Sequence, residues 1–489
     1  MFRLLKFELI KAFSKKSIYV IWSLMFLFCI LNNVLFYTDY DSNGNYKYQE
    51  VENLSSEKAK LEKEIALYNK DNPHEVNMYV TLKTKLDIIS LKEKYSYQSW
   101  QYCKLNNYLY DVIYQINYFT YAENNVDNRN IEKKKYQEIL SKLESNDYNY
   151  FLKLDIEELE KGISELEIEY QRISDIEKKK ELAEEIRENK FNLSILKYRL
   201  KENIKEDNSY LNKALEEYQS SYKIINSYDN VSELSYLDKV NYQENLSTLK
   251  ISQYVVKNKV NINKQNTFAY QLRTIIDDYE IFFVILVLMV SSSIICDEFK
   301  DGTIKLLLIK PYSRGKILLS KYLTTIIVVL VSVLMLIITQ FIIGGSIFKF
   351  EGFNVPVVVY NFNSSKLIEY SVIEYMLIRI IAKIPFLLVL IGISMFLSVL
   401  FNSLIISITM PLMLYMFSPT LMYLTEQYKL HFMKYLININ WNLEDYLFGQ
   451  LPKLSFINLK FSVIIMGVYL LVLFLGMLII FKKKNIKNI

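Results

Sequence analysis

The side chains most often used in catalysis are sparse in this chain. The two histidines, His74 and His431, lie far apart, and the three cysteines are scattered, so nothing has the spacing of a metal site. The string Arg314-Gly315-Lys316 lacks the upstream glycine that a phosphate-binding loop requires. We therefore predict that this chain has no catalytic residues, binds no metal and holds no cofactor of its own.

The charged stretch DEFKDGTIKLLLIKPYSRGKILLSKYL, residues 297–323, lies between two apolar runs and is a better candidate for function. Asp301 and Gly302 are turn-forming residues, and Thr303 is a suitable N-cap for a short amphipathic helix that Pro311 ends. Ser313 is expected to cap the next helix. Such a helix can dock on a cytosolic protein and carry its motion to the flanking spans.

The basic residues Arg314, Lys316 and Lys321 follow this short helix in the sequence. They come just before the next long apolar run, where a membrane surface would lie. We expect all three side chains to lie near lipid phosphates.

The composition divides the chain into polar and apolar parts. Of its 489 residues 51% are hydrophobic, yet residues 37–278 are polar and rich in Lys, Glu, Asn and Tyr. Only 11 glycines and 7 prolines occur, which favours long helices with few turns. This pattern predicts an all-α membrane protein with one large domain outside the bilayer.

Six apolar segments are about 20 residues long, the length that crosses a bilayer. The first is too long for a cleavable signal peptide. In the fourth segment we expect Glu374, Arg379 and Lys383 to lie near the outer interface and to pair or reach toward water. In the fifth we expect Pro411 to kink the helix. The segments are 17–36, 279–296, 322–345, 373–400, 404–424 and 461–481.

Lysine and arginine counts give the orientation. Three segments carry more basic than acidic residues: 1–16, 297–321 and 482–489. With six spans all three lie on the same side of the membrane, which the positive-inside rule assigns to the cytoplasm. Residues 37–278 carry an excess of acidic side chains and are expected to be extracellular. The predicted domains are therefore 1–36 (elbow helix and first span), 37–278 (external domain) and 279–489 (five spans with a cytoplasmic loop at 297–321).

The external domain is expected to be an elongated helical or coiled-coil projection. Heptad spacing runs from Ile156 to Ile173, and a second register runs from Ile186 to Leu200. Between them the chain either turns or continues with a slipped register. Whether this projection binds a ligand or is only structural is left open by the sequence.

The polar side chains inside the predicted spans can be interpreted in two ways. They are either hydrogen-bonding contacts between helices or the lining of a transport pathway. The candidates are Asn32, Asn33, Ser292, Gln340, Ser394 and Ser398.

The charged stretch resembles the permease subunits of ABC-2 type ABC transporters. In that family the loop between spans two and three carries a Glu, then Gly-Thr, a basic residue, an apolar triplet, Pro and Ser-Arg. MFRLLKFELIKAFSKKSIYV is similar to the family's interfacial elbow helix, and six spans with both termini inside also match. The corresponding loop residues here are Glu298, Gly302, Thr303, Lys305, Leu306, Leu307, Pro311, Ser313 and Arg314.

This resemblance implies a multi-pass permease of a bacterial cell membrane that dimerises with itself or a sibling. A cytosolic P-loop ATPase would dock on residues 303–309 and would hold the ATP and Mg²⁺. The chain departs from simple members of the family by its long segment 37–278. That departure suits export of a peptide, an antimicrobial compound or a lipid-like molecule, or an external peptide or protein ligand.

Two other functions fit the same sequence. One is a scaffold or receptor without a transport cycle, like surface proteins of the phage-infection and type VII secretion kind. The other is a sensing or resistance module in which the external helices capture an antimicrobial peptide. No feature suggests nucleic-acid binding.

Overall fold

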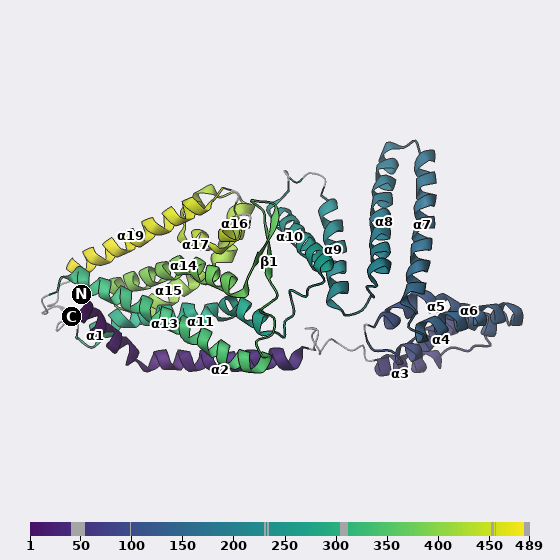
Figure 1. Ribbon diagram of the computed structural model, residues 1–489, viewed down its shortest axis with the longest axis horizontal. Helices are drawn as coiled ribbons and strands as arrows, with labels where there is room; N and C mark the ends of the chain where they lie inside the picture. Colours follow the sequence, from purple (N-terminus) through teal and green to yellow (C-terminus); the bar gives the residue numbers. More distant parts are fainter. Residues whose placement is uncertain are drawn as a thin grey trace. The chain divides into compact units, whose positions relative to one another are not determined.

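The structure, a computed structural model, describes residues 1–40, 54–97, 99–228, 231, 234–303, 312–450, 454 and 456–483. The chain forms two compact units, each described here by itself (Figure 1). The apolar unit comprises Met1–Gly44, Tyr228–Ile251 and Ile262–Ile489. The polar unit comprises Asn45–Ser227 and Ser252–Asn261. The predicted external domain at 37–278 stays a prediction, because its boundaries depend on a membrane.

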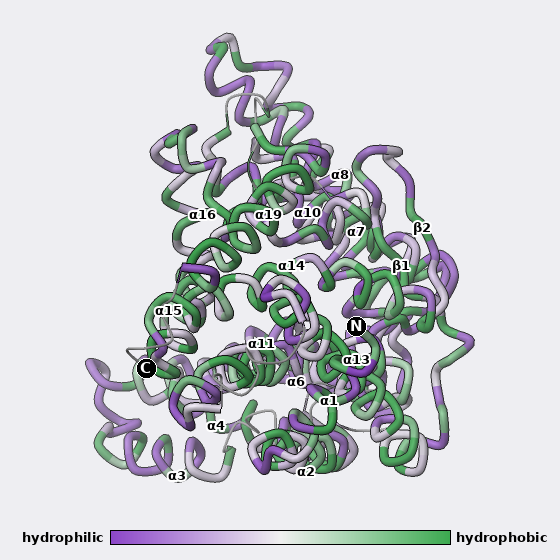
Figure 2. The backbone as a smooth tube through the Cα atoms, turned by 90° about the vertical axis from the view of Figure 1, so that its left-hand side faces the viewer, coloured by the Kyte–Doolittle hydropathy of each residue, from purple (hydrophilic) through white to green (hydrophobic). Residues whose placement is uncertain are grey.

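The apolar unit is a bundle of long helices. Its most buried helix is α11, which packs against α14, α13, α15 and α2, and Figure 2 shows these helices around it. Its elements are α1 (Phe2–Phe13), α2 (Lys16–Asp39), α11 (Phe268–Lys300), α13 (Arg314–Phe348), β1 (Val357–Asn361), β2 (Lys366–Tyr370), α14 (Val372–Phe401), α15 (Leu404–Met416), α16 (Ser418–Gln427), η2 (His431–Tyr435), α17 (Ile437–Asn440), α18 (Glu444–Leu447) and α19 (Leu459–Lys483).

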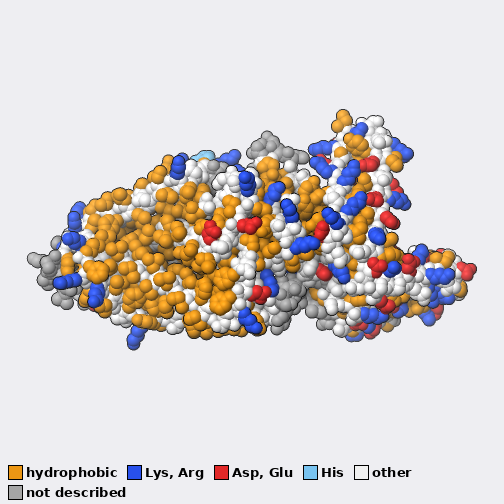
Figure 3. Space-filling model, viewed as in Figure 1, with side chains coloured by type: hydrophobic (Ala, Val, Ile, Leu, Met, Phe, Trp, Pro, Cys, Tyr) orange, Lys and Arg blue, Asp and Glu red, His pale blue; other side chains and the backbone are white. Residues whose placement is uncertain are grey.

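Five described helices are long and apolar enough to cross a membrane: α2, α11, α13, α14 and α19. In α11 67% of an apolar stretch of 18 residues is buried inside the protein, whereas the corresponding share is 28% in α2 and 11% in α19. The outer helices therefore present apolar faces, and Figure 3 shows hydrophobic side chains covering this side of the unit. Such a surface is stable in lipid, where apolar exposure has no cost.

The predicted fifth span is a bent pair, α15 and α16, which meet at 43°. Pro411 lies inside α15, and the bend between the two helices comes after it, so a kink at Pro411 stays a prediction. The two helices separate at Phe417, and Pro419 occupies the first turn of α16. Proline is tolerated in a first turn, where its missing N–H would have no partner in the helix.

A two-stranded antiparallel hairpin follows α13, which the sequence analysis did not predict. Val357 pairs with Tyr370 and Asn361 with Lys366. The β-branched run Val357–Val359 favours an extended backbone over a helix. The hairpin is held to the loop after α18, since the amide of Phe362 donates to the carbonyl of Gly449 and the Gln450 side chain to that of Tyr360.

The polar unit is helical. Its core contains Trp100, Leu109 and Phe151. The buried Lys104 side chain pairs with Asp155 (2.7 Å) and Glu206 (2.9 Å). Burial alone would lower the pKa of Lys104, but the two carboxylates raise it above its ordinary value. The elements are α3 (Leu54–Ile65), α4 (Val76–Lys92), α5 (Trp100–Tyr121), α6 (Val126–Glu144), α7 (Tyr148–Arg172), α8 (Ile176–Glu202) and α9 (Tyr210–Asn226), while α10 (Tyr236–Asn258) has residues in both units.

Helices α7 and α8 form an antiparallel pair (Figure 1). Ion pairs join Glu160 to Lys197 (2.7 Å) and Glu167 to Lys190 (2.6 Å). The residue numbers rise along α7 while those of the partners fall along α8, so the two helices run in opposite directions. The chain turns between Arg172 and Ile176, and Asp175 caps α8. Of the two possibilities left open by the heptads, a turn and a slipped register, the turn is the one found.

Candidate functional site

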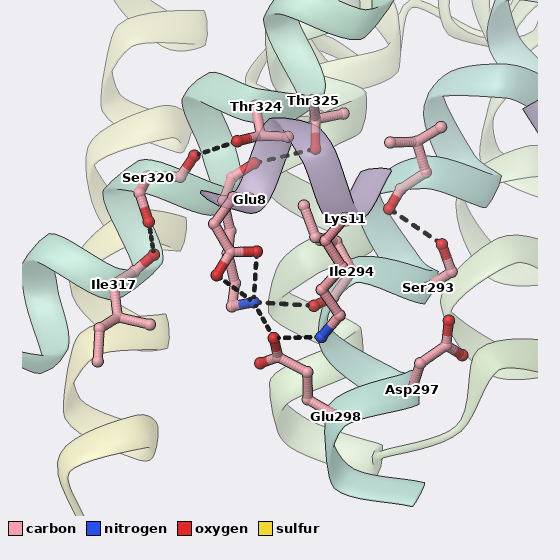
Figure 4. Close-up of polar contacts among 12 residues, drawn as sticks. Glu8, Lys11, Ser293, Ile294, Asp297, Glu298, Ile317, Ser320, Thr324 and Thr325 are labelled. Atoms are coloured by element: carbon pink, nitrogen blue, oxygen red, sulfur yellow. Dashed lines mark hydrogen bonds and ion pairs between the residues drawn. The ribbon is translucent and has the colours of Figure 1, made fainter. Parts of the chain in front are cut away.

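A buried group of ion pairs lies where α1, α11 and α13 meet, at the end of the apolar unit that also carries the end of α19 (Figures 1 and 4). At its centre is Lys321 on α13. Its Nζ lies 3.1 Å from both carboxylate oxygens of Glu8, 2.7 Å from Oε1 of Glu298 and 3.1 Å from the carbonyl of Ile294. Glu8, Glu298 and Lys321 are all at most 1% exposed.

Two further lysines extend this cluster. Lys11 of α1 pairs with the same Glu298 oxygen at 2.7 Å. Lys15 donates to Asp297 Oδ2 (2.7 Å) and to the Ser293 hydroxyl (2.8 Å). Burial lowers the pKa of Lys15, and its ion pair with Asp297 acts in the opposite direction. We call Glu8, Lys11, Lys15, Asp297, Glu298 and Lys321 the elbow cluster.

Helix α1 brings Glu8 into the cluster through its spacing of buried residues. Leu4, Glu8 and Ala12 recur every four positions and form the buried stripe of the helix. Leu4 packs on Ile317 of α13, next to Tyr312. The opposite side of α1 exposes Phe2, Phe7 and Ile10, as expected of a helix that lies in a membrane interface.

The facing side of α13 is made of small polar residues. Ser320, Thr324 and Thr325 are fully buried, and each hydroxyl donates to a carbonyl within α13 itself. Their hydrogen-bonding needs are therefore met locally, and their small size lets α1 approach closely. Figure 4 shows Glu8 and Lys11 directed from α1 towards Glu298.

The elbow cluster is electrically balanced, with three carboxylates facing three lysines. Such a group is costly to bury and becomes strongly destabilising when one partner is removed. It therefore holds α1, α11 and α13 in one arrangement. Among the described residues no three His, Cys, Asp or Glu side chains are placed to bind a metal ion.

The structure describes some of the predicted loop residues and not others. Gly302 forms the predicted turn with a φ of +67°, which favours glycine, and Ser313 caps α13 by accepting from the amide of Lys316. Arg314 donates to the carbonyls of Phe481 and Lys482 at the end of α19. Thr303 ends the described part of the loop. Four predicted residues, Lys305, Leu306, Leu307 and Pro311, lie outside the described residues.

Placing Lys321 near lipid phosphates was wrong, because its side chain is buried against Glu8 and Glu298. Sequence reasoning also missed Glu8 as a partner of Lys321, and Lys11 as the second cation on Glu298. A usable signal was present, since Glu8 shares a helical face with Leu4 and Ala12, and Lys321 shares one with Ile317. That spacing indicates burial, and a buried charge requires a partner.

Part of the chain matches a known protein family. Residues 239–487, half of the chain, match the family model described as "Protein of unknown function (DUF2705)". The chain belongs to the DUF2705 family. The matched region includes Glu298 and Lys321 but not α1 with Glu8 and Lys11.

The chain is also similar to a Bacillus subtilis (strain 168) protein, "Uncharacterized protein YhcI", with 25% identity over 201 residues. That match covers 41% of this chain and 64% of the relative, less than two thirds of its length. No solved structure matches this DUF2705 chain.

Two of the polar residues predicted within the spans of this DUF2705 protein pair with each other. Asn33 of α2 donates to Gln340 Oε1 (2.9 Å), and Gln340 of α13 donates back to Asn33 Oδ1 (3.0 Å). Cys29 also donates to Gln340 (3.3 Å), and all three side chains are buried. This reciprocal pair satisfies both amides, as a contact between helices requires.

The predicted serines are buried along α11 and α14. Ser292 donates to the carbonyl of Leu288 (2.6 Å), and Ser394 of α14 reaches the same carbonyl at 3.4 Å. Ser398 donates to the carbonyl of Ser394 (2.8 Å), and Asn32 is only partly buried. The structure does not bring these four side chains together with Asn33 and Gln340 in one lining, so their role in a pathway stays a prediction.

Replacing Asn33 with leucine is expected to lower the free energy of unfolding by about 1–2 kcal/mol, because the Gln340 amide is left buried without its partner. Replacing both residues with leucine should cost less than the sum of the single changes. Unfolding in mixed micelles, titrated with a denaturing detergent, gives the four values of this double-mutant cycle. A coupling energy near zero would contradict the contact.

Proposed function

We propose that this protein is the transmembrane permease subunit of an ATP-driven exporter of the ABC-2 type. The observation that carries the proposal is the elbow cluster, which ties α1 to α11 and α13, the two helices that border the loop at 301–313. A force applied to this loop reaches both helices at their buried ends. An ATPase that docks on the loop can therefore change the packing of the whole bundle.

The proposed topology has six spans, with α15 and α16 counted as one bent span. Basic residues of α1, α2, α13 and α19 support a cytoplasmic location for this end, among them Lys6, Lys16, Lys316 and Lys483. Figure 3 shows Lys and Arg side chains at this end of the unit. The polar unit then lies outside the cell. The position of α1, with Phe2 and Phe7 exposed beside the charged end, supports an elbow helix in the inner interface.

In this proposal ATP and Mg²⁺ bind to a separate cytosolic subunit, and this chain supplies only the membrane pathway. Two permease copies, or one copy and a sibling, would enclose the pathway. The substrate would be a peptide, an antimicrobial compound or a lipid-like molecule. The polar unit would then contact the substrate or an external partner, or serve as a spacer.

The test is purification of the tagged protein from its native membrane in a gentle detergent, followed by mass spectrometry of the proteins that accompany it. We expect a P-loop ATPase in a stoichiometric amount. Its absence, with a secretion or wall-synthesis protein in its place, would refute the permease assignment and favour a scaffold. A vector-only membrane treated identically identifies contaminants.

A further inference from the structure

A second group of charges lies at the opposite end of α11, beside a cavity. The cavity, of about 50 Å³, lies between α11, α13 and α14. Its walls are apolar and include Phe283, Val333 and Leu387. Its two ionisable side chains are Glu280 and Lys383, which pair at 2.8 Å. A charged pair at an apolar cavity between membrane helices is a site where a ligand with a charged head can bind.

The surrounding ion pairs contain more carboxylates than cations. Lys383 also lies 3.8 Å from Glu444, and Glu444 accepts from Arg379 Nε at 2.6 Å. Arg379 pairs in addition with Asp277. Three carboxylates, those of Asp277, Glu280 and Glu444, therefore share two cations.

The neighbouring charges do not remove this excess. Arg273 points its guanidinium at the carbonyl of Ile262 (3.1 Å) and the side-chain oxygen of Asn263 (3.2 Å). Asp278 accepts from the Thr274 hydroxyl and adds another carboxylate. Asp445 on α18 is acidic as well, whereas Glu374 on α14 is exposed and lies outside the cavity. The region as a whole is acidic. Asp277 is 57% exposed, but Glu280 and Glu444 are largely buried, and buried carboxylates are unfavourable without cations.

We propose that this cavity binds a cationic amphiphile. Its ammonium head pairs with Glu280, and Lys383 keeps a carboxylate partner because Glu444 lies on its other side. The cavity accepts the head and the first carbons of the tail. The rest of the tail lies along Leu330 and Ile384, which line the cavity and are 44% and 37% exposed. Charge complementarity and an apolar wall thus select for one sign of charge on an alkyl chain.

This inference rests on binding alone, so it stands or falls separately from the proposed coupling to an ATPase. The probe is dodecylammonium, and dodecyl sulfate, with the same chain and the opposite charge, is the control. The full-length protein in phosphatidylcholine nanodiscs is titrated with each probe by calorimetry, and titrations of empty nanodiscs are subtracted. We expect saturable binding of dodecylammonium and none of dodecyl sulfate.

The variant Glu280→Gln removes the charge and keeps the shape, and binding of dodecylammonium should weaken about 10- to 100-fold, the value of one charged hydrogen bond. The matched control Glu374→Gln, on α14 but outside the cavity, should bind as the unmodified protein does. Val333→Phe fills the cavity without altering any charge and should also abolish binding. Equal binding of both probes, or unchanged binding in Glu280→Gln and Val333→Phe, would overturn the proposal.

Discussion

Replacing Lys321 with methionine is expected to lower the free energy of unfolding by about 3–5 kcal/mol, because Glu8 is left buried without a cation. Glu298 loses one of its two ammonium partners in the same change and keeps only Lys11. Thermal unfolding in detergent, followed by circular dichroism, measures the effect. It is the largest loss of stability that we expect from any single substitution in this protein.

The matched control is Lys316→Met, which removes an exposed lysine from the same helix and should be almost neutral. The double variant Glu8→Gln with Lys321→Met removes both charges and should recover much of the lost stability. If Lys321→Met unfolded at the same temperature as Lys316→Met, the elbow cluster would have no structural importance. The proposal that it transmits motion from the loop would then lose its support.

Replacing Leu306 and Leu307 with aspartate is expected to weaken association with the ATPase subunit about 100-fold, because two charges enter an apolar docking face. Both residues lie in the predicted docking helix, outside the described residues. Co-purification of the ATPase with the variant, quantified against the unmodified protein, measures the loss. Export or resistance that depends on ATP should fall with it.

A control for the added negative charge is Lys6→Asp, which changes the net charge by the same amount at an exposed position of α1. This variant should retain most of the bound ATPase. Normal yield of both variants in the membrane fraction shows that insertion is intact. Undiminished ATPase binding by the Leu306 and Leu307 variant would place the docking surface elsewhere.

The pairing of charges in the fourth predicted span illustrates how far local sequence can be read. Arg379 and Lys383 sit one helical turn apart at the start of α14, and their spacing predicted that they pair or reach toward water. The structure confirms that both cations are paired, but with residues of other helices rather than with Glu374. Their partners Glu444 and Asp277 come from α18 and α11, and no pattern in the sequence identifies them.

The sequence by itself determined the features that depend on neighbouring residues. Runs of about 20 apolar residues produce helices able to cross a membrane whatever surrounds them, since every backbone group bonds within its own helix. Ser313 caps α13 and Gly302 forms a turn for similarly local reasons. The helical character of the chain belongs to the same class, whereas the turn between α7 and α8 was one of two possibilities that the heptads left open.

Only the tertiary structure decided which distant residues meet. Lys321 and Glu8 are 313 positions apart, and Asn33 and Gln340 are 307 apart. A lysine before an apolar run is equally compatible with lipid phosphates and with a buried carboxylate. The choice depends on whether α1 folds back onto α13, which the small residues Ser320 and Thr324 permit. Long-range packing therefore fixes the elbow cluster and the cavity at Glu280, because the energy of a charge depends on what surrounds it in space.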